Sequence, residues 1–134
     1  MISRRKTILL AFTGLIGTTA PVVAWSKKLD PIAQLDTDHD GTVDLAEAKK
    51  AASDLFDRLD TDKDGTVSVR ELHGRLSRKD FAAADPDKDK TLTKDEYLAV
   101  VEQRFKAADP DGDGSVSAAE FKTPAGRALL RLLQ

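Results

Sequence analysis

The sequence predicts an all-α protein, a compact helical bundle with four closely spaced acidic loops and short β contacts, on the scale of about two residues, between paired loops. A twelve-residue segment that is rich in aspartate and ends in glutamate occurs four times, beginning at Asp36, Asp60, Asp85 and Asp109. The starts are separated by 24, 25 and 24 residues, so one structural unit repeats along the chain. The stretches between the segments carry apolar residues three and four positions apart, which is the spacing of one helix face.

Residues 1–24 are expected to be a signal peptide. A basic start, Arg4-Arg5-Lys6, precedes a short apolar run over residues 8–16, and Ala24 precedes the expected cleavage point. The alternative is an uncleaved membrane anchor, for which the apolar stretch is marginal in length. We therefore expect a periplasmic protein whose single domain spans residues 25–134. General secretory export is favoured slightly over twin-arginine export, because Thr7 stands where the twin-arginine signal has a large apolar residue.

Charge and composition exclude several classes of partner and site. The chain of 134 residues has a net charge of −2, and loss of Arg4, Arg5 and Lys6 with the signal peptide would change it to −5. An acidic chain is a poor match for nucleic acid, and no basic patch for a membrane surface is expected after cleavage. There is no cysteine, and the only histidines are His39 and His73, so a zinc site of Cys and His ligands is excluded.

Helix signals lie between the loops and at both ends of the domain. Asp30-Pro31 predicts a short helix through Leu35, and Thr123-Pro124 predicts a C-terminal helix. Gly74 interrupts the connector between loops two and three, which predicts two short helices with a bend near Ser77. The apolar stripes that support helices are Leu45, Ala48, Ala52, Leu55, Phe56 and Leu59 after loop one, Leu98, Val101, Phe105 and Ala108 after loop three, and Leu129, Leu130, Leu132 and Leu133 at the end.

These connectors also predict which loops meet. A helix of twelve residues is about 18 Å long, so loops one and two lie at opposite ends of the helix that joins them. The bent connector brings loops two and three together, and the straight connector after loop three returns loop four to loop one. We predict the pairs two/three and one/four. The apolar residue at position eight of each loop would make the strand contacts, namely Val43, Val67, Leu92 and Val116.

The loop pattern suits a hard cation such as Ca²⁺, which takes six to eight oxygen ligands. Acids at positions one, three and five point inward, position seven offers its carbonyl, position nine contributes directly or through water, and the glutamate at position twelve binds through both oxygens. The predicted ligands are Asp36, Asp38, Asp40, Thr42, Asp44 and Glu47 in loop one; Asp60, Asp62, Asp64, Thr66, Ser68 and Glu71 in loop two; Asp85, Asp87, Asp89, Thr91, Thr93 and Glu96 in loop three; and Asp109, Asp111, Asp113, Ser115, Ser117 and Glu120 in loop four.

The four loops are not expected to be equal. Loop one offers five carboxylates, because Asp44 occupies position nine, and it keeps Gly41 at position six. Loop three has Lys90 at position six, where a non-glycine residue in the left-handed region costs about 1–2 kcal/mol. We expect loop three to be the weakest site. His39, at a variable loop position, is interpreted as a solvated side chain.

The chain from residue 25 resembles the lanmodulin family of exported EF-hand proteins. The residues that carry the resemblance are the four loops and the stretches LFDRLD, KDEYLAVVEQRFKAADPDGDGSVSAAE and TPAGRALLRLL. The resemblance implies up to four bound trivalent lanthanide or Ca²⁺ ions and a chain that compacts on binding. The family has proline at position two and an acid at position nine. Pro86 and Pro110 match, whereas Thr37 and Thr61 differ, and only Asp44 supplies the acid, so Ca²⁺ stays open as the metal.

We predict a metal-binding protein that serves the buffering, trafficking or uptake of Ca²⁺ or lanthanide ions. The alternative is a calcium sensor that binds a periplasmic partner when loaded, although Met1 is the only methionine and no adaptable methionine-rich groove can form. A dockerin-like adhesion module fits four loops poorly. The sequence contains no recognisable nucleophile–base pair or phosphate-binding loop, so no enzymatic activity is expected. The sequence does not identify a protein partner.

Overall fold

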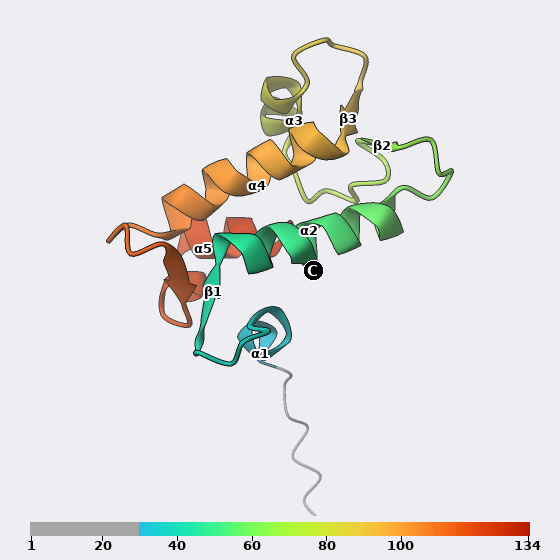
Figure 1. Ribbon diagram of the computed structural model, residues 1–134. Helices are drawn as coiled ribbons and strands as arrows, with labels where there is room; N and C mark the ends of the chain where they lie inside the picture. The colour runs from blue at the N-terminus through green and yellow to red at the C-terminus, as the bar shows by residue number, and fades with distance from the viewer. Residues whose placement is uncertain (1–29) are drawn as a thin grey trace, which may run out of the picture.

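Two antiparallel helices form the centre of the molecule, α2 (Leu45–Leu59) and α4 (Lys94–Ala108). The computed structural model describes residues 30–134, and the expected signal peptide lies outside these residues. Helices α2 and α4 pack side by side, and one pair of loops lies at each end of them (Figure 1). Within the described residues, no helix has the length and apolar character needed to cross a bilayer.

Each central helix begins at the loop before it. The Asp44 side chain accepts a hydrogen bond from the Glu47 N–H, and the Glu47 carboxylate accepts one from the Asp44 N–H, which forms a capping box at the start of α2. Thr93 and Glu96 form the same box at the start of α4. The last residue of a loop is therefore fixed in the first turn of a helix of 15 residues.

The loops pair as predicted, through two short antiparallel sheets. Strand β1 (Thr42–Asp44) pairs with β4 (Ser115–Ser117), and β2 (Thr66–Ser68) pairs with β3 (Thr91–Thr93). The central pairs are Val43 with Val116 and Val67 with Leu92, and all four side chains are fully buried. The predicted all-α bundle with loop pairs one/four and two/three is confirmed.

The shorter helices pack against the central pair and the loops, with α1 (Pro31–Leu35) against α2 and β1, and α3 (Arg78–Ala84) and α5 (Pro124–Leu130) against α4. Helix α1 is capped by Asp30, α3 by Ser77, and α5 by Thr123, as the sequence signals predicted. A 3₁₀ turn, η1 (Glu120–Lys122), lies between loop four and α5. Leu129, Leu132 and Leu133 from the C-terminal segment complete the core beside α4.

One helix predicted from the sequence is absent, and another is shorter than the sequence indicated. The first half of the connector between loops two and three is a series of turns over residues 69–76, because His73 and Gly74 both take positive φ values, 47° and 77°. The C-terminal helix ends at Leu130. Beyond it the Leu132 and Leu133 N–H groups bond to carbonyls three residues back, at 2.8 and 3.0 Å, which tightens the last turn.

Ion pairs connect the central helices near both ends. Lys49 on α2 contacts Glu102 on α4 at 2.9 Å, and Lys94 on α4 contacts Asp57 on α2 at 2.6 Å. Hydrogen bonds and charge from Lys49 and Lys106 hold the pKa of Glu102 at about 2. The side chains of both pairs are exposed to solvent, so each pair contributes little to the stability of the fold.

Candidate metal centre

Each acidic loop is held by secondary structure at both ends. Position one is the C-cap of the preceding helix, as Asp36 follows α1 and Asp60 follows α2. Asp85 and Asp109 follow α3 and α4 in the same way. Positions seven to nine form the short strand, and position twelve lies in the first turn beyond it. In loops two and four this arrangement brings ligand oxygens of the first and last acids within 4.8 Å of each other.

The carboxylate at position one is the base of each loop, buried in loops one, two and three and partly buried in loop four. Asp36, Asp60 and Asp85 are each 6% exposed or less. One oxygen of each accepts the N–H of position six, and the same bond is made in loop four. The distances are 2.8 Å from Gly41, 3.0 Å from Gly65, 3.0 Å from Lys90 and 3.0 Å from Gly114. Burial of a carboxylate is costly without such partners, so these bonds make the buried acid tolerable.

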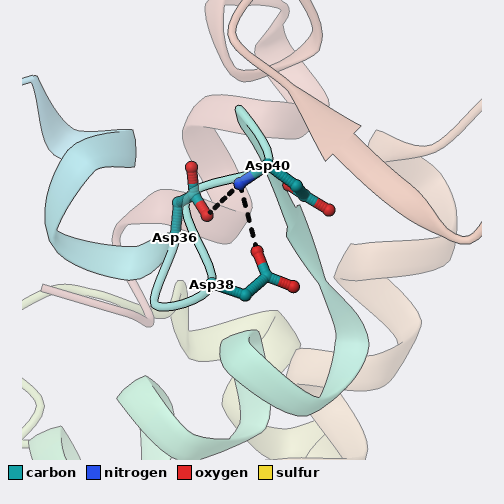
Figure 2. A group of neighbouring side chains, drawn as sticks. All are labelled: Asp36, Asp38 and Asp40. Atoms are coloured by element: carbon teal, nitrogen blue, oxygen red, sulfur yellow. Dashed lines mark hydrogen bonds between the residues drawn. The ribbon is translucent and has the colours of Figure 1, made fainter.

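Further acids crowd around this base in all four loops. The ligand oxygens that lie within 4.8 Å of one another belong to Asp36, Asp38 and Asp40; to Asp60, Asp62 and Glu71; to Asp85, Asp87 and Asp89; and to Asp109, Asp111 and Glu120. Figure 2 shows the loop-one group, in which the Asp40 N–H donates to Asp36 at 3.1 Å and to Asp38 at 3.2 Å. The groups leave out position twelve in loops one and three, and position five in loops two and four.

The crowding of acids raises the pKa of the carboxyl groups at position three. The pKa of Asp87 is raised, first by its contact with Asp85 and further by burial and by the charges of Asp89 and Glu96. The pKa of Asp111 is raised in the same way by Asp109. A bound cation would reverse this repulsion, because opposite charge favours the ionised carboxylates.

Loop three contains an unpartnered buried oxygen. In the other loops the second oxygen of the position-one aspartate accepts the N–H of position five, at 3.1 Å in loop one, 3.2 Å in loop two and 3.2 Å in loop four. In loop three no hydrogen bond reaches Asp85 Oδ1, which is the one buried side-chain oxygen or nitrogen of the described residues without a partner. A buried and unpartnered carboxyl oxygen that lies close to two further carboxyl groups fits a metal ligand, so the residues present suit a hard cation even in the loop with Lys90.

Two positions of every loop adopt the left-handed backbone. At position six, Lys90 has φ 70° where the other loops have glycine. At position four, His39, Lys63 and Lys88 have φ values of 62°, 59° and 57°, and loop four has Gly112 there. The left-handed backbone at position six was predicted from the glycines there, whereas that at position four was not. The signal was present in Gly112, since glycine is the residue that takes this conformation without strain.

The residue at position two determines how the closing glutamate is held. In loop one the Thr37 N–H and hydroxyl donate to Glu47 Oε1 at 2.6 and 2.8 Å. Thr61 donates twice to Glu71 in loop two, at 3.2 and 3.1 Å. Loops three and four have Pro86 and Pro110 at this position. Proline has neither an N–H nor a hydroxyl, so it cannot make these bonds.

The side chain at position nine accepts a hydrogen bond from the backbone N–H of position twelve in every loop. From the sequence, position nine was predicted only as a metal ligand. The Asp44 carboxylate accepts the N–H of position twelve at 2.7 Å, and the hydroxyls of Ser68, Thr93 and Ser117 accept it at 3.3–3.4 Å.

At position seven the side chains turn toward position five, since Thr42, Thr66, Thr91 and Ser115 each donate their hydroxyl to that aspartate at 2.8–3.0 Å. The hydroxyl of position seven is thus engaged within the loop, which leaves its carbonyl as the oxygen predicted to bind metal.

Comparison with known families covers all four loops. Residues 49–124 match the EF-hand domain pair family, and residues 29–50 match the EF hand family. The first match spans more than half of the chain. A search of curated proteins finds no match. The matched families are EF-hand families, whose members are in general modules that bind metal ions.

Proposed function

The chain belongs to the EF-hand domain pair family, and from that premise we propose that it is an exported protein that binds Ca²⁺, trivalent lanthanide ions or both, for metal buffering, trafficking or uptake. The observation that carries the proposal is the group of three converging acids in each loop, with oxygens within 4.8 Å of one another. Four such groups on one small domain favour the capture of several ions. Export rests on the basic and apolar start of the sequence.

The ligands that we propose are the acids at positions one, three, five and twelve, the carbonyl of position seven and the group at position nine. The acids start from a strained arrangement in which like charges face one another. An ion that neutralises them stabilises the folded chain by mass action, because it binds the folded form and not the unfolded one.

We expect loop one to prefer trivalent over divalent ions more strongly than the other loops do. Its five carboxylates include Asp44, whose Oδ1 caps helix α2, leaving the second oxygen of the same carboxylate for an ion or its water. The attraction between ion and ligand scales with the product of their charges, so an extra carboxylate favours a 3+ ion over a 2+ ion. Ser68 and Ser117 occupy this position in loops two and four, where the charge argument gives La³⁺ a smaller advantage.

A competitive titration tests the metal. The protein is first loaded with Ca²⁺, and La³⁺ is added while bound and free ions are measured by equilibrium dialysis. Displacement of Ca²⁺ by La³⁺ at much lower free concentration supports a lanthanide role for the protein. Retention of Ca²⁺ against equimolar La³⁺ assigns the loops to calcium, and failure to bind either ion contradicts the proposed function.

A further inference from the structure

Loop four ends in a different structure from loops one and three. Glu47 and Glu96 lie in the first turn of helices of 15 residues, whereas Glu120 begins a 3₁₀ turn of only three. A turn of this length has few internal hydrogen bonds and poor geometry, so it holds a side chain weakly without other support. The closing glutamate of loop four therefore depends on what packs against it.

Thr123 supplies part of that support. Its N–H donates to the Glu120 carbonyl at 3.0 Å, and its hydroxyl donates to the same carbonyl at 2.6 Å. The hydroxyl oxygen also accepts the Gly126 N–H at 3.0 Å, which caps α5. One side chain thus joins the backbone of the closing glutamate to the start of the next helix.

Gly126 allows α5 to touch this turn. The residue is buried, and a Cβ built on it would overlap the Glu120 carbonyl oxygen and lie 2.5 Å from Phe121 Cα. Its φ is not positive, so the requirement is for space and not for an unusual backbone. Glycine inside a helix is unfavourable relative to alanine. The close approach to Glu120 is the feature of the structure that requires glycine here.

The core fixes α5 in turn. Leu129 and Leu132 are fully buried beside α4, and the Tyr97 hydroxyl donates to the Leu132 carbonyl at 2.9 Å. Tyr97 follows Glu96, the closing glutamate of loop three, on α4. The C-terminal segment is therefore a rigid support against which the three-residue turn of loop four can be placed.

We propose that Thr123 and Gly126 are positioning residues for Glu120, and that through them the C-terminal helix sets the metal affinity of loop four. The proposal rests on the proposed function, since it concerns how one of the four metal loops is held. It assigns Thr123 and Gly126 no contact with the ion. They act on the backbone that carries the ligand, so their effect is confined to loop four and to loop one, its partner in the β1–β4 sheet.

The variant Gly126→Ala distinguishes an effect on the position of Glu120 from an effect on the stability of helix α5. Alanine favours the helix, so a purely local effect would strengthen α5, whereas the clash with Glu120 must move α5 away from the turn. We follow La³⁺ binding by nuclear magnetic resonance at the position-six amides, because each of them bonds to the position-one aspartate of its own loop. The Gly114 signal should report about tenfold weaker binding at loop four. The Gly65 and Lys90 signals should change less than about twofold.

Thr123→Val and Thr123→Ser provide the matched pair, and they decide the question if Gly126→Ala does not fold. Valine keeps the shape and loses both hydroxyl bonds, so loop four should weaken by about two- to tenfold. Serine keeps the hydroxyl and should restore the affinity. Equal weakening of all four loops, or no change at loop four, would overturn the positioning role. If the unmodified protein responds to neither La³⁺ nor Ca²⁺ at any loop, the proposed function itself fails and the positioning role falls with it.

Discussion

Lys90 is the residue at which loop three departs from the other loops. Its backbone lies in the left-handed region, as the glycines at position six of the other loops do, but with a side chain and a positive charge. The N–H of Lys90 still reaches the buried aspartate at 3.0 Å. Loop three therefore keeps the geometry of the other loops, although the left-handed backbone of Lys90 is energetically unfavourable.

Lys90→Gly should strengthen metal binding at loop three. Relief of the left-handed conformation is worth about 1 kcal/mol, or roughly a fivefold gain in affinity, and removal of the ammonium adds to it. Lys90→Ala is the control, because it removes the charge and keeps the strained backbone. Calorimetry with Ca²⁺ should rank the variants glycine, alanine, lysine from tightest to weakest. Unchanged or weaker binding in Lys90→Gly would show that position six does not limit loop three.

Asp44 should control the choice between ions of different charge. Asp44→Ser gives loop one the residue that loops two and four have at position nine. In those loops the serine hydroxyl accepts the N–H of position twelve, so we expect the variant to keep the helix cap of loop one. We expect the ratio of the dissociation constants for Ca²⁺ and La³⁺ to fall in this variant. The same ratio should rise in the double variant Ser68→Asp with Ser117→Asp. If Asp44→Ser weakens both ions by one factor, Asp44 is a general ligand and the lanthanide assignment loses its support.

Among the elements, the loops and long helices could be predicted and the turns between them could not. The four acidic repeats and their 24-residue spacing predicted α2, α4 and the pairing of the loops, because a straight helix separates two loops and a bend brings two together. The segment 69–76 was predicted as a helix and is a set of turns. Gly74 signalled an interruption, but the left-handed conformation of His73 has no signature in the sequence.

In the candidate site, too, some features could be predicted from the sequence and others could not. The ligand types and positions come directly from the repeat, whereas the capping role of position nine and the bonds from Thr37 and Thr61 to the closing glutamates depend on how each loop folds back on itself. The approach of Gly126 to loop four was invisible in the sequence. It joins two elements whose contact no periodic pattern describes.

The packing of the C-terminal segment on α4 should make a measurable contribution to stability. Tyr97 is fully buried, and burial raises the pKa of its hydroxyl well above its usual value. Tyr97→Phe removes the bond to the Leu132 carbonyl and leaves that acceptor buried, at a cost of about 1–3 kcal/mol. Urea denaturation of the metal-loaded protein should show this loss, and the exposed Lys50→Ala variant should be neutral. A loss in Tyr97→Phe no larger than that in Lys50→Ala would mean that the hydroxyl is not needed to hold the segment.

At the scale of the whole molecule, charge opposes folding and metal should reverse it. The described core is made largely of aliphatic side chains, and the loops bring carboxylates together at both ends of it. Repulsion within such a charged domain favours expanded states until ions neutralise it.

Removal of metal should therefore lower the helix content. Circular dichroism in the presence of a chelator should show much weaker helical bands than in the presence of excess Ca²⁺ or La³⁺, and re-addition of metal should restore them. Mg²⁺ at the same concentration is the control for ionic strength, because it accepts this coordination reluctantly. Identical spectra with chelator and with metal would show that the chain folds without ions.

The number of ions bound per chain tests the central claim, that the four acidic loops are cation sites. Equilibrium dialysis against La³⁺, with elemental analysis of both compartments, should give four ions per chain, one for each group of acids. Replacement of the position-one aspartate by asparagine in a single loop should remove one ion. The combined variant Asp36→Asn, Asp60→Asn, Asp85→Asn and Asp109→Asn should bind none at the same free concentration. Binding by this variant equal to that of the unmodified protein would contradict the account.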